Sequence, residues 1–277
     1  IGILYWFEFW PLSAWAVIFI ALMSLAMAPA EWAQRIGADI ALRDQPDPLI
    51  LYEDDSRYYH IAVKQAADNP KRLFFYQDRL KHSEILTDEI LNLQYFYTKI
   101  YAAITEGMSR NREKLNVMAI GGGGYVFPRY VERVWPGSNI DVIEIDPEVT
   151  DAAKQAFGLE ANTTIHTIHM DARNYVDQLT ERKRNGTETA SYDFIYGDAF
   201  NDFSLPFQLV TRQFNDRIAA LLSDDGLYML NLLDIFDSGL FLGAVVGTLE
   251  KTFPFVYVLT SGDVPHSSQS TFVLIAA

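Results

Sequence analysis

The sequence contains no cysteine among its 277 residues. This absence excludes disulfide bonds, thiolate metal sites and a cysteine nucleophile. The five histidines never occur at the HxxxH spacing of a zinc-binding helix, so we expect no metal cofactor. Basic residues are also scarce. The 22 Lys and Arg against 36 Asp and Glu give a net charge of −14, which argues against nucleic acid as a partner and favours cationic small molecules.

Charge of either sign is missing from Pro11 to Ala30. A run of this length and composition predicts a transmembrane helix. A signal peptide is the first alternative, because Ala-Pro-Ala ends the run, but no basic residue precedes it. A buried core helix is the second. Arg35 and Arg43 follow the run and only Glu8 precedes it, so the positive-inside bias predicts an inner-membrane protein with its C-terminal bulk in the cytoplasm.

The chain is organised around Leu115–Pro147, which reads as strand, glycine turn, helix and strand. Four glycines, from Gly121 and Gly122 to Gly123 and Gly124, follow the first strand. Glycine lets the backbone turn tightly and approach a ligand, and a helix N-terminus behind it offers unpaired N–H groups. Glu144 ends the second strand near the spacing expected of an acid that binds both ribose hydroxyls. The segment therefore predicts half of a nucleotide-binding βαβ unit.

The glycine pattern also discriminates between ligands. A dinucleotide fingerprint requires glycine at its sixth position, where this chain has Val126, and no Gly-Lys-Ser/Thr of a P-loop follows. An adenosyl-sulfonium cofactor, S-adenosylmethionine or its decarboxylated form, fits better. A glycine turn that serves packing alone is the structural alternative.

Strands alternate with helices after this unit, which predicts an α/β fold with a Rossmann-like sheet of the class I methyltransferase type. Before it, short strands predict a small antiparallel sheet, and Thr87 has N-cap chemistry for a helix through LNLQYFYTKIYAAI. We therefore expect a transmembrane segment and linker over 1–45, a small β-hairpin domain over 46–86 and a Rossmann-like adenosyl-cofactor-binding domain over 87–277.

Three carboxylates follow predicted strands: Glu144, Asp171 and Asp198. In such a sheet, ligands bind beyond the carboxyl ends of the strands. Asp171, followed by Ala172, suits adenine recognition, and capping of the next helix explains it equally well. Asp198 precedes an irregular loop and suits a catalytic carboxylate under a lid; helix or turn capping is again the alternative.

In their order, GGGG, DVIEIDP, MDAR and YDFIYGDAF, preceded by DSRYYHI, QDRLKHS and YFYTKIY, are similar to the spermidine synthase (polyamine aminopropyltransferase) family. The chain most resembles bacterial membrane-linked members, over about residues 50–277. This resemblance implies a transferase of polyamine biosynthesis that uses decarboxylated S-adenosylmethionine and a small-molecule amine acceptor, with a homodimer as a further expectation.

The resemblance also implies roles for individual residues. Gly121, Gly122, Gly123 and Glu144 bind the cofactor, Asp171 and Ala172 contact adenine, and Asp198 receives a proton from the attacking amine. Tyr97 lines the acceptor channel. The remaining matches are in the small sheet: Ser56, Tyr58, His60 and the hairpin acid Asp78.

Several positions depart from the family pattern, and most are on the acceptor side. The acid that holds the cofactor amine is replaced by Gly124, a helix glutamate by Lys99 and a second lid aspartate by Asn201, with Asp202 as a neighbouring substitute. Tyr59 and His82 replace glutamines, and Arg79 replaces a glycine. We predict substrate contacts from Tyr59, Asp78, His82 and Asp202.

Three hypotheses follow. The first is an aminopropyltransferase with an altered acceptor site. The second, favoured by Gly124, is an S-adenosylmethionine-dependent methyltransferase or other enzyme using that cofactor. The third is a non-catalytic ligand-binding module of a membrane protein.

Overall fold

The computed structural model describes residues 47–189, 191–200, 205–262 and 267–277, preceded by 12–27 and positions 29, 32, 35, 36, 39 and 40. The chain divides into two compact units, Ile1–Pro48 and Leu49–Ala277. Each unit is considered by itself below.

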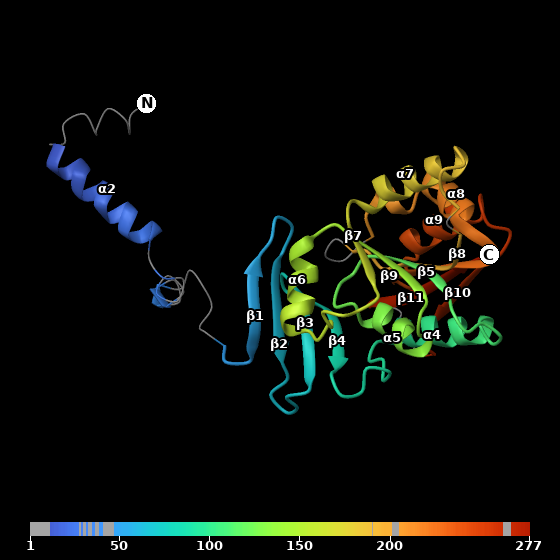
Figure 1. Ribbon diagram of the computed structural model, residues 1–277, viewed down its shortest axis with the longest axis horizontal. Helices are drawn as coiled ribbons and strands as arrows, with labels where there is room; N and C mark the ends of the chain where they lie inside the picture. The colour runs from blue at the N-terminus through green and yellow to red at the C-terminus, as the bar shows by residue number, and fades with distance from the viewer. Residues whose placement is uncertain are drawn as a thin grey trace. The chain divides into compact units, whose positions relative to one another are not determined.

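The first unit contains helix α2 (Leu12–Ala26), which is 15 residues long and carries no charged residue (Figure 1). Spanning a bilayer takes about 20 residues of helix. Within the described residues, no helix combines the length and the apolar character needed to cross a membrane. The prediction of a transmembrane helix over 11–30 is therefore not supported. Within the first unit by itself, Val17 and Phe19 of α2 are each 66% exposed.

The second unit begins with a four-stranded antiparallel sheet in the order β1-β2-β3-β4. The sequence predicts a small antiparallel sheet in this region but not the number or the order of its strands. Its strands are β1 (Ile50–Asp55), β2 (His60–Gln65), β3 (Arg72–Gln77) and β4 (Leu80–Leu86). Alternating burial along β3 and β4 gives this sheet one apolar face. Ile61, Phe75 and Ile85 from that face belong to the same hydrophobic cluster as residues of the larger sheet. The small sheet therefore shares a core with the rest of the unit.

The larger sheet has seven strands in the order β10-β11-β9-β8-β5-β6-β7. The five strands from β9 to β7 are parallel, and β11 runs antiparallel to both β9 and β10. The chain leaves β5 towards β6 and β7 first and returns to add β8 and β9 on its other side. The strand order thus reverses at β5, where α/β sheets bind ligands. The strands are β5 (Asn116–Ile120), β6 (Asn139–Glu144), β7 (His166–His169), β8 (Tyr192–Gly197), β9 (Leu222–Ile235), β10 (Val256–Thr260) and β11 (Gln269–Ala276).

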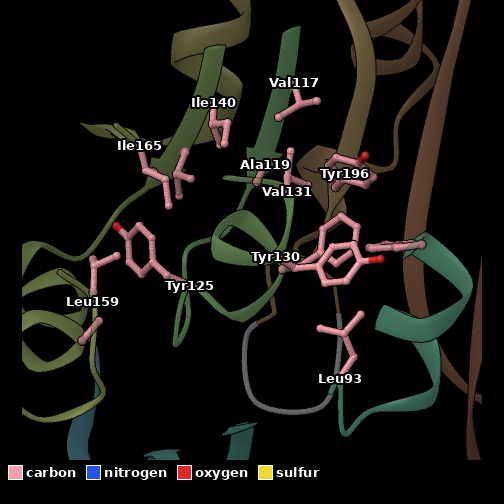
Figure 2. Packing of buried hydrophobic residues seen from close by; sticks show 14 of the residues in the cluster. Leu93, Val117, Ala119, Tyr125, Tyr130, Val131, Ile140, Leu159, Ile165 and Tyr196 are labelled. Carbon is pink, nitrogen blue, oxygen red and sulfur yellow. The ribbon is translucent and has the colours of Figure 1, made fainter. Parts of the chain in front are cut away.

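Helices cover both faces of this sheet, with α4 and α5 on one side and α7, α8 and α9 on the other (Figure 1). Val117, Ala119 and Ile140 from the strands share a buried cluster with Tyr130 and Val131 of α5 (Figure 2). Burial of a valine or isoleucine side chain such as Val117 or Ile140 contributes about 1.5–3 kcal/mol. The helices are α4 (Phe96–Met108), α5 (Val126–Val134), α6 (Pro147–Ala156), α7 (Ala172–Arg184), the 3₁₀ turn η1 (Phe207–Leu209), α8 (Arg212–Leu221) and α9 (Leu240–Leu249). The mixed α/β, Rossmann-like expectation is confirmed.

The start of α4 differs from the prediction. The helix begins at Phe96, with Tyr95 as its N-cap, instead of after Thr87. Thr87 donates its backbone N–H to the carbonyl oxygen of Lys71 at 2.9 Å and its hydroxyl to the same oxygen at 3.3 Å. Both bonds close the end of the β3–β4 hairpin. The Thr87 hydroxyl, which the sequence predicts as a helix cap, therefore bonds the backbone at the other end of the hairpin instead.

The close approach of Gly121 to the backbone of Asp198 can be tested by substitution. Its φ of +97° disfavours any side chain, and a Cβ would lie 2.6 Å from the carbonyl oxygen of Asp198. We expect Gly121→Ala to lower the free energy of unfolding by about 2–4 kcal/mol. Gly107→Ala in α4 is the matched control: a Cβ there meets nothing within 4 Å, and better helix propensity adds about 0.5 kcal/mol. Urea unfolding measures both, and equal stabilities would contradict the close approach.

Candidate active site

A cavity of about 460 Å³ lies beyond the carboxyl ends of β5, β6, β7 and β8. The strand ends contribute Gly121–Gly123, Glu144, Asp171 and Asp198, as the sequence predicts for carboxylates after parallel strands. The opposite wall comes from the β3–β4 hairpin and the start of α4. The volume is within the range of about 300–1,000 Å³ typical of small-molecule sites.

Glu144 orders the glycine loop. Its Oε2 accepts the N–H of Gly122 at 2.8 Å and of Gly123 at 3.4 Å, and its Oε1 accepts the N–H of Asp146 at 2.9 Å. Burial raises the pKa of Glu144, and these backbone donors oppose that rise. A carboxylate has about four acceptor positions, so these three bonds leave one position of Glu144, a residue of the cavity lining.

Gly124 joins the loop to the small sheet. Its N–H donates to Ser83 Oγ of β4 at 3.2 Å. A Cβ at this position would lie 2.3 Å from the Phe157 ring and 2.9 Å from the Ser83 Cβ. Such distances require the neighbours to move, so packing against Phe157 explains why this position carries no acidic side chain.

Asp171 and Ala172 line the cavity at the end of β7. The Oδ1 of Asp171 accepts the backbone N–H of Asn174 at 2.9 Å, which makes Asp171 the N-cap of α7. The capping interpretation is therefore confirmed. Adenine recognition by the same side chain stays a prediction.

Asp198 lies next to Gly121, at the end of β8, and is partly buried. The Tyr97 hydroxyl of α4 donates to its Oδ2 at 2.7 Å, and the Asn231 Nδ2 of β9 donates to its Oδ1 at 2.8 Å. Burial raises the pKa of Asp198 to about 6, although both hydrogen bonds favour the charged form. A carboxylate with this pKa is largely ionised at neutral pH and accepts a proton more readily than an ordinary aspartate.

The residues expected to contact substrate have different positions. Tyr59 and His82 line the cavity, and Tyr59 donates its hydroxyl to the carbonyl oxygen of Phe200 at 3.3 Å. Asp78 is in the hairpin turn with a φ of 52°, where its Oδ1 accepts the backbone N–H of His60 at 3.0 Å. Asp78 does not belong to the cavity lining. Its side chain instead connects the hairpin turn to the start of β2. Asp202 falls outside the described residues.

Lys99 does not belong to the cavity lining, contrary to the expectation that it alters the acceptor site. Tyr97 and Lys99 are two positions apart on α4, and such residues project from different sides of a helix. Tyr97 reaches Asp198, whereas Lys99 is exposed to solvent. Similarity of position in a motif did not reveal this orientation.

Several polar side chains of the lining were missed in the sequence. They are Gln77, Lys81, Tyr95, Gln208, Asn231 and Gln269. Asn231 could have been identified from the sequence, because it is the one amide in the apolar run LYMLNLL of β9. Its contact with Asp198 joins residues 33 positions apart and depends on the pairing of β8 with β9.

The fold and the cavity define a Rossmann-like domain of the methyltransferase type. Among solved structures, it is similar to a probable spermidine synthase from Corynebacterium glutamicum, with a TM-score of 0.72 and 20% identity over 84% of this chain and 81% of that one. It is also similar to human methyltransferase-like protein 13 in complex with SAH, with a TM-score of 0.53 and 25% identity over 65% and 81% of the two chains.

The sequence comparison is more specific. The spermine/spermidine synthase domain matches residues 74–260, and the chain belongs to this family. The polyamine aminopropyltransferase of Vibrio vulnificus is 31% identical over 186 residues, which cover 66% of this chain and 58% of that protein. The chain spans about half the length of the curated relatives it matches.

The two donors to Asp198 predict a pH effect. Asn231→Leu removes a hydrogen bond that favours the carboxylate, so the pKa of Asp198 should rise by about one unit above its present value. The acid limb of any activity that needs the carboxylate then moves to higher pH. Carboxyl NMR titration measures the pKa directly. Asn215→Leu, at a buried asparagine of α8, is the control and should leave the Asp198 titration unchanged. A lower pKa in Asn231→Leu would contradict the assignment.

Proposed function

We propose that this chain is an aminopropyltransferase, which moves an aminopropyl group from decarboxylated S-adenosylmethionine to an amine acceptor. The observation that carries the proposal is the position of Asp198 in the cavity lining, together with the glycine loop, while Tyr97 and Asn231 each donate to one of its carboxylate oxygens. Membership of the spermine/spermidine synthase family supports the same transferase chemistry.

Residues of the strand ends fit the adenosyl part of the cofactor. Gly121, Gly122 and Gly123 line the cavity without side chains, and Glu144 beside them keeps one acceptor position, which we assign to a ribose hydroxyl. Asp171 and Ala172 are at the next strand end, where we assign them to adenine. When bound, the sulfonium supplies an activated carbon: the acceptor nitrogen forms a bond to it, the carbon–sulfur bond breaks and methylthioadenosine leaves.

The protein then has to position the amine and remove a proton. The carboxylate of Asp198 is the acceptor of that proton, and its raised pKa of about 6 makes it a stronger base than an exposed aspartate. Tyr97 cannot take this role, because burial and the Asp198 charge raise its pKa well above the usual value. Tyr97 instead fixes the carboxylate through its hydroxyl. Positioning of two substrates in one cavity supplies the rest of the rate enhancement.

Methyl transfer from S-adenosylmethionine is the second candidate. Gly124 carries no acid that would select the decarboxylated cofactor, and the likeness to human methyltransferase-like protein 13 favours this reading. A non-catalytic ligand-binding module is the third. Product formation from each cofactor form separates the three.

Paired substitutions test the proposal. Asp198→Asn should leave cofactor binding nearly intact and slow aminopropyl transfer about 100-fold or more, the scale of a lost general base. Glu144→Ala should instead weaken cofactor binding by about 1–3 kcal/mol, because charge-assisted hydrogen bonds disappear. Calorimetry and methylthioadenosine release measure the two effects. Full turnover in Asp198→Asn, or unchanged cofactor affinity in Glu144→Ala, would contradict the assigned roles.

We propose in addition that residues 11–30 attach the chain to the inner membrane, with the second unit on the cytoplasmic side. The support is the uncharged sequence of α2 and the exposure of its apolar side chains. The homodimer likewise stays a prediction, and the mass of the protein in solution tests it.

Flotation with lipid vesicles tests the attachment. The full chain should float with vesicles, and Phe19→Glu combined with Leu22→Glu should keep it in the dense fraction, because each charge resists burial in hydrocarbon. Leu240→Glu is the matched control, at a leucine of α9 that is 80% exposed in the second unit. A full chain that does not float would overturn the proposal.

A further inference from the structure

Two segments that line the cavity are joined by one arginine side chain. The first segment is the end of β7 with the start of α7, where Asp171 and Ala172 line the cavity. The second is the 3₁₀ turn η1, where Gln208 and Leu209 line it. Arg173 follows Ala172 in α7, and its guanidinium reaches the main chain of η1. The two segments are therefore no further apart than the length of this side chain.

The guanidinium of Arg173 holds the end of η1 through two hydrogen bonds. Its Nη1 donates to the carbonyl oxygen of Gln208 at 2.8 Å and to the Thr211 Oγ1 at 2.9 Å. Thr211 is the N-cap of α8, and its Oγ1 also accepts the N–H of Phe214 at 3.3 Å. Hydrogen bonds from a charged donor are stronger than those between neutral groups. Arg173 thus fixes the backbone where η1 meets α8.

Two neighbours orient the Arg173 side chain. Its Nε lies 3.6 Å from the Asp177 Oδ1, one turn further along α7. Its Cζ lies 5.9 Å from the centre of the Phe214 ring, which is fully buried. The side chain of Arg173 is 24% exposed, so most of its surface is covered by these contacts and by η1. A planar guanidinium held in this way presents its donors in a fixed direction.

Arg173 acts on one end only of the connection from β8 to α8. This connection begins directly after Asp198, and at that end the Tyr59 hydroxyl donates to the carbonyl oxygen of Phe200 at 3.3 Å. Arg173 itself does not line the cavity, and its contact with the lining is the main chain of Gln208. Removal of the guanidinium therefore releases η1 and leaves the contacts of Asp198 in place.

We propose that Arg173 is a positioning residue for the adenosyl ligand, because it holds η1 as a wall beside the end of β7. This inference rests on the proposed function, since it takes adenine to bind at Asp171 and Ala172. The η1 turn borders that position, and van der Waals contacts weaken steeply when a wall moves by even a fraction of an ångström. Arg173 thus determines the affinity for the adenosyl group without contacting it.

Calorimetry on the full chain with methylthioadenosine and with S-adenosylhomocysteine tests this role. Arg173→Met keeps an unbranched apolar stem but removes the donors, so the affinity for both ligands should fall about tenfold, the scale of a lost charged hydrogen bond. Arg173→Lys keeps the charge and a donor, and its affinity should fall about threefold or less. Wild-type affinity in Arg173→Met, or no binding of either ligand to the wild-type chain, would overturn the inference.

Arg217→Met is the matched control. The Arg217 Nε lies 2.7 Å from the Asp177 Oδ1, so both arginines share one carboxylate. The Arg217 Nη1, however, donates to the carbonyl oxygen of Gln213 within α8 and not to η1. Affinity for both ligands should stay within about twofold of wild type, because a partly exposed ion pair contributes little. An equal loss in Arg217→Met and Arg173→Met would contradict a specific role of Arg173.

Hydrogen exchange measured by mass spectrometry locates the change in the chain. The N–H of Leu209 donates to the carbonyl oxygen of Pro206 at 2.9 Å within η1. Exchange over residues 205–211 should become about tenfold faster in Arg173→Met and stay at the wild-type rate in Arg217→Met. Exchange over β8 should stay unchanged in both variants, which a general loss of stability would not produce. Unchanged exchange over 205–211 in Arg173→Met would overturn the inference.

Steady-state kinetics separates this inference from the proposed function. In Arg173→Met, the KM for decarboxylated S-adenosylmethionine should rise about tenfold while kcat, which depends on Asp198, changes less than about twofold. If the binding and exchange results are as expected but no acceptor yields methylthioadenosine, aminopropyl transfer is wrong and the role of Arg173 stands. If the wild-type chain transfers aminopropyl groups and Arg173→Met keeps the wild-type KM, the proposed function stands and the inference is wrong.

Discussion

The close approach of Gly121 to the main chain of Asp198 is the constraint on which the site depends. Backbone pairing brings the ends of β5 and β8 together: the Asp198 N–H donates to the carbonyl oxygen of Ile120 at 2.8 Å. Gly121 then turns away with a positive φ that leaves no room for a Cβ. One strand pair thus places a glycine loop, the N-terminus of a helix and a carboxylate around the same volume, and the remaining elements contribute walls to it.

Much of this arrangement could be predicted from the sequence. Carboxylates that follow apolar strands must gather at one edge of a parallel sheet, so the positions of Glu144, Asp171 and Asp198 needed only the alternation of strands and helices. Interactions between distant segments could not be read in this way. The amide of Asn231 reaches Asp198 through strand order, and Thr87 pairs with Lys71 although its sequence context is typical of a helix cap.

The direction in which a side chain points also could not be predicted by comparing motifs. Lys99 occupies a motif position associated with the acceptor, yet the rotation of α4 directs it to solvent. Sequence reasoning assigned no role to Lys81 of the hairpin. Among the described residues, Lys81 and not Lys99 lines the cavity. Gly124 illustrates a different cause, because its missing side chain follows from contact with Phe157 as much as from ligand chemistry. A departure from a family pattern therefore has a functional meaning only after its surroundings are known.

The β3–β4 hairpin contributes both a hydrogen bond to the glycine loop and residues of the cavity wall. Ser83 accepts the N–H of Gly124 in the glycine loop, and Lys81, His82 and Ser83 all line the cavity. One short continuous segment thus supplies both an anchor for the glycine loop and part of the cavity wall. A change in this short segment therefore acts on the cavity wall and, through Ser83 and Gly124, on the glycine loop at the same time.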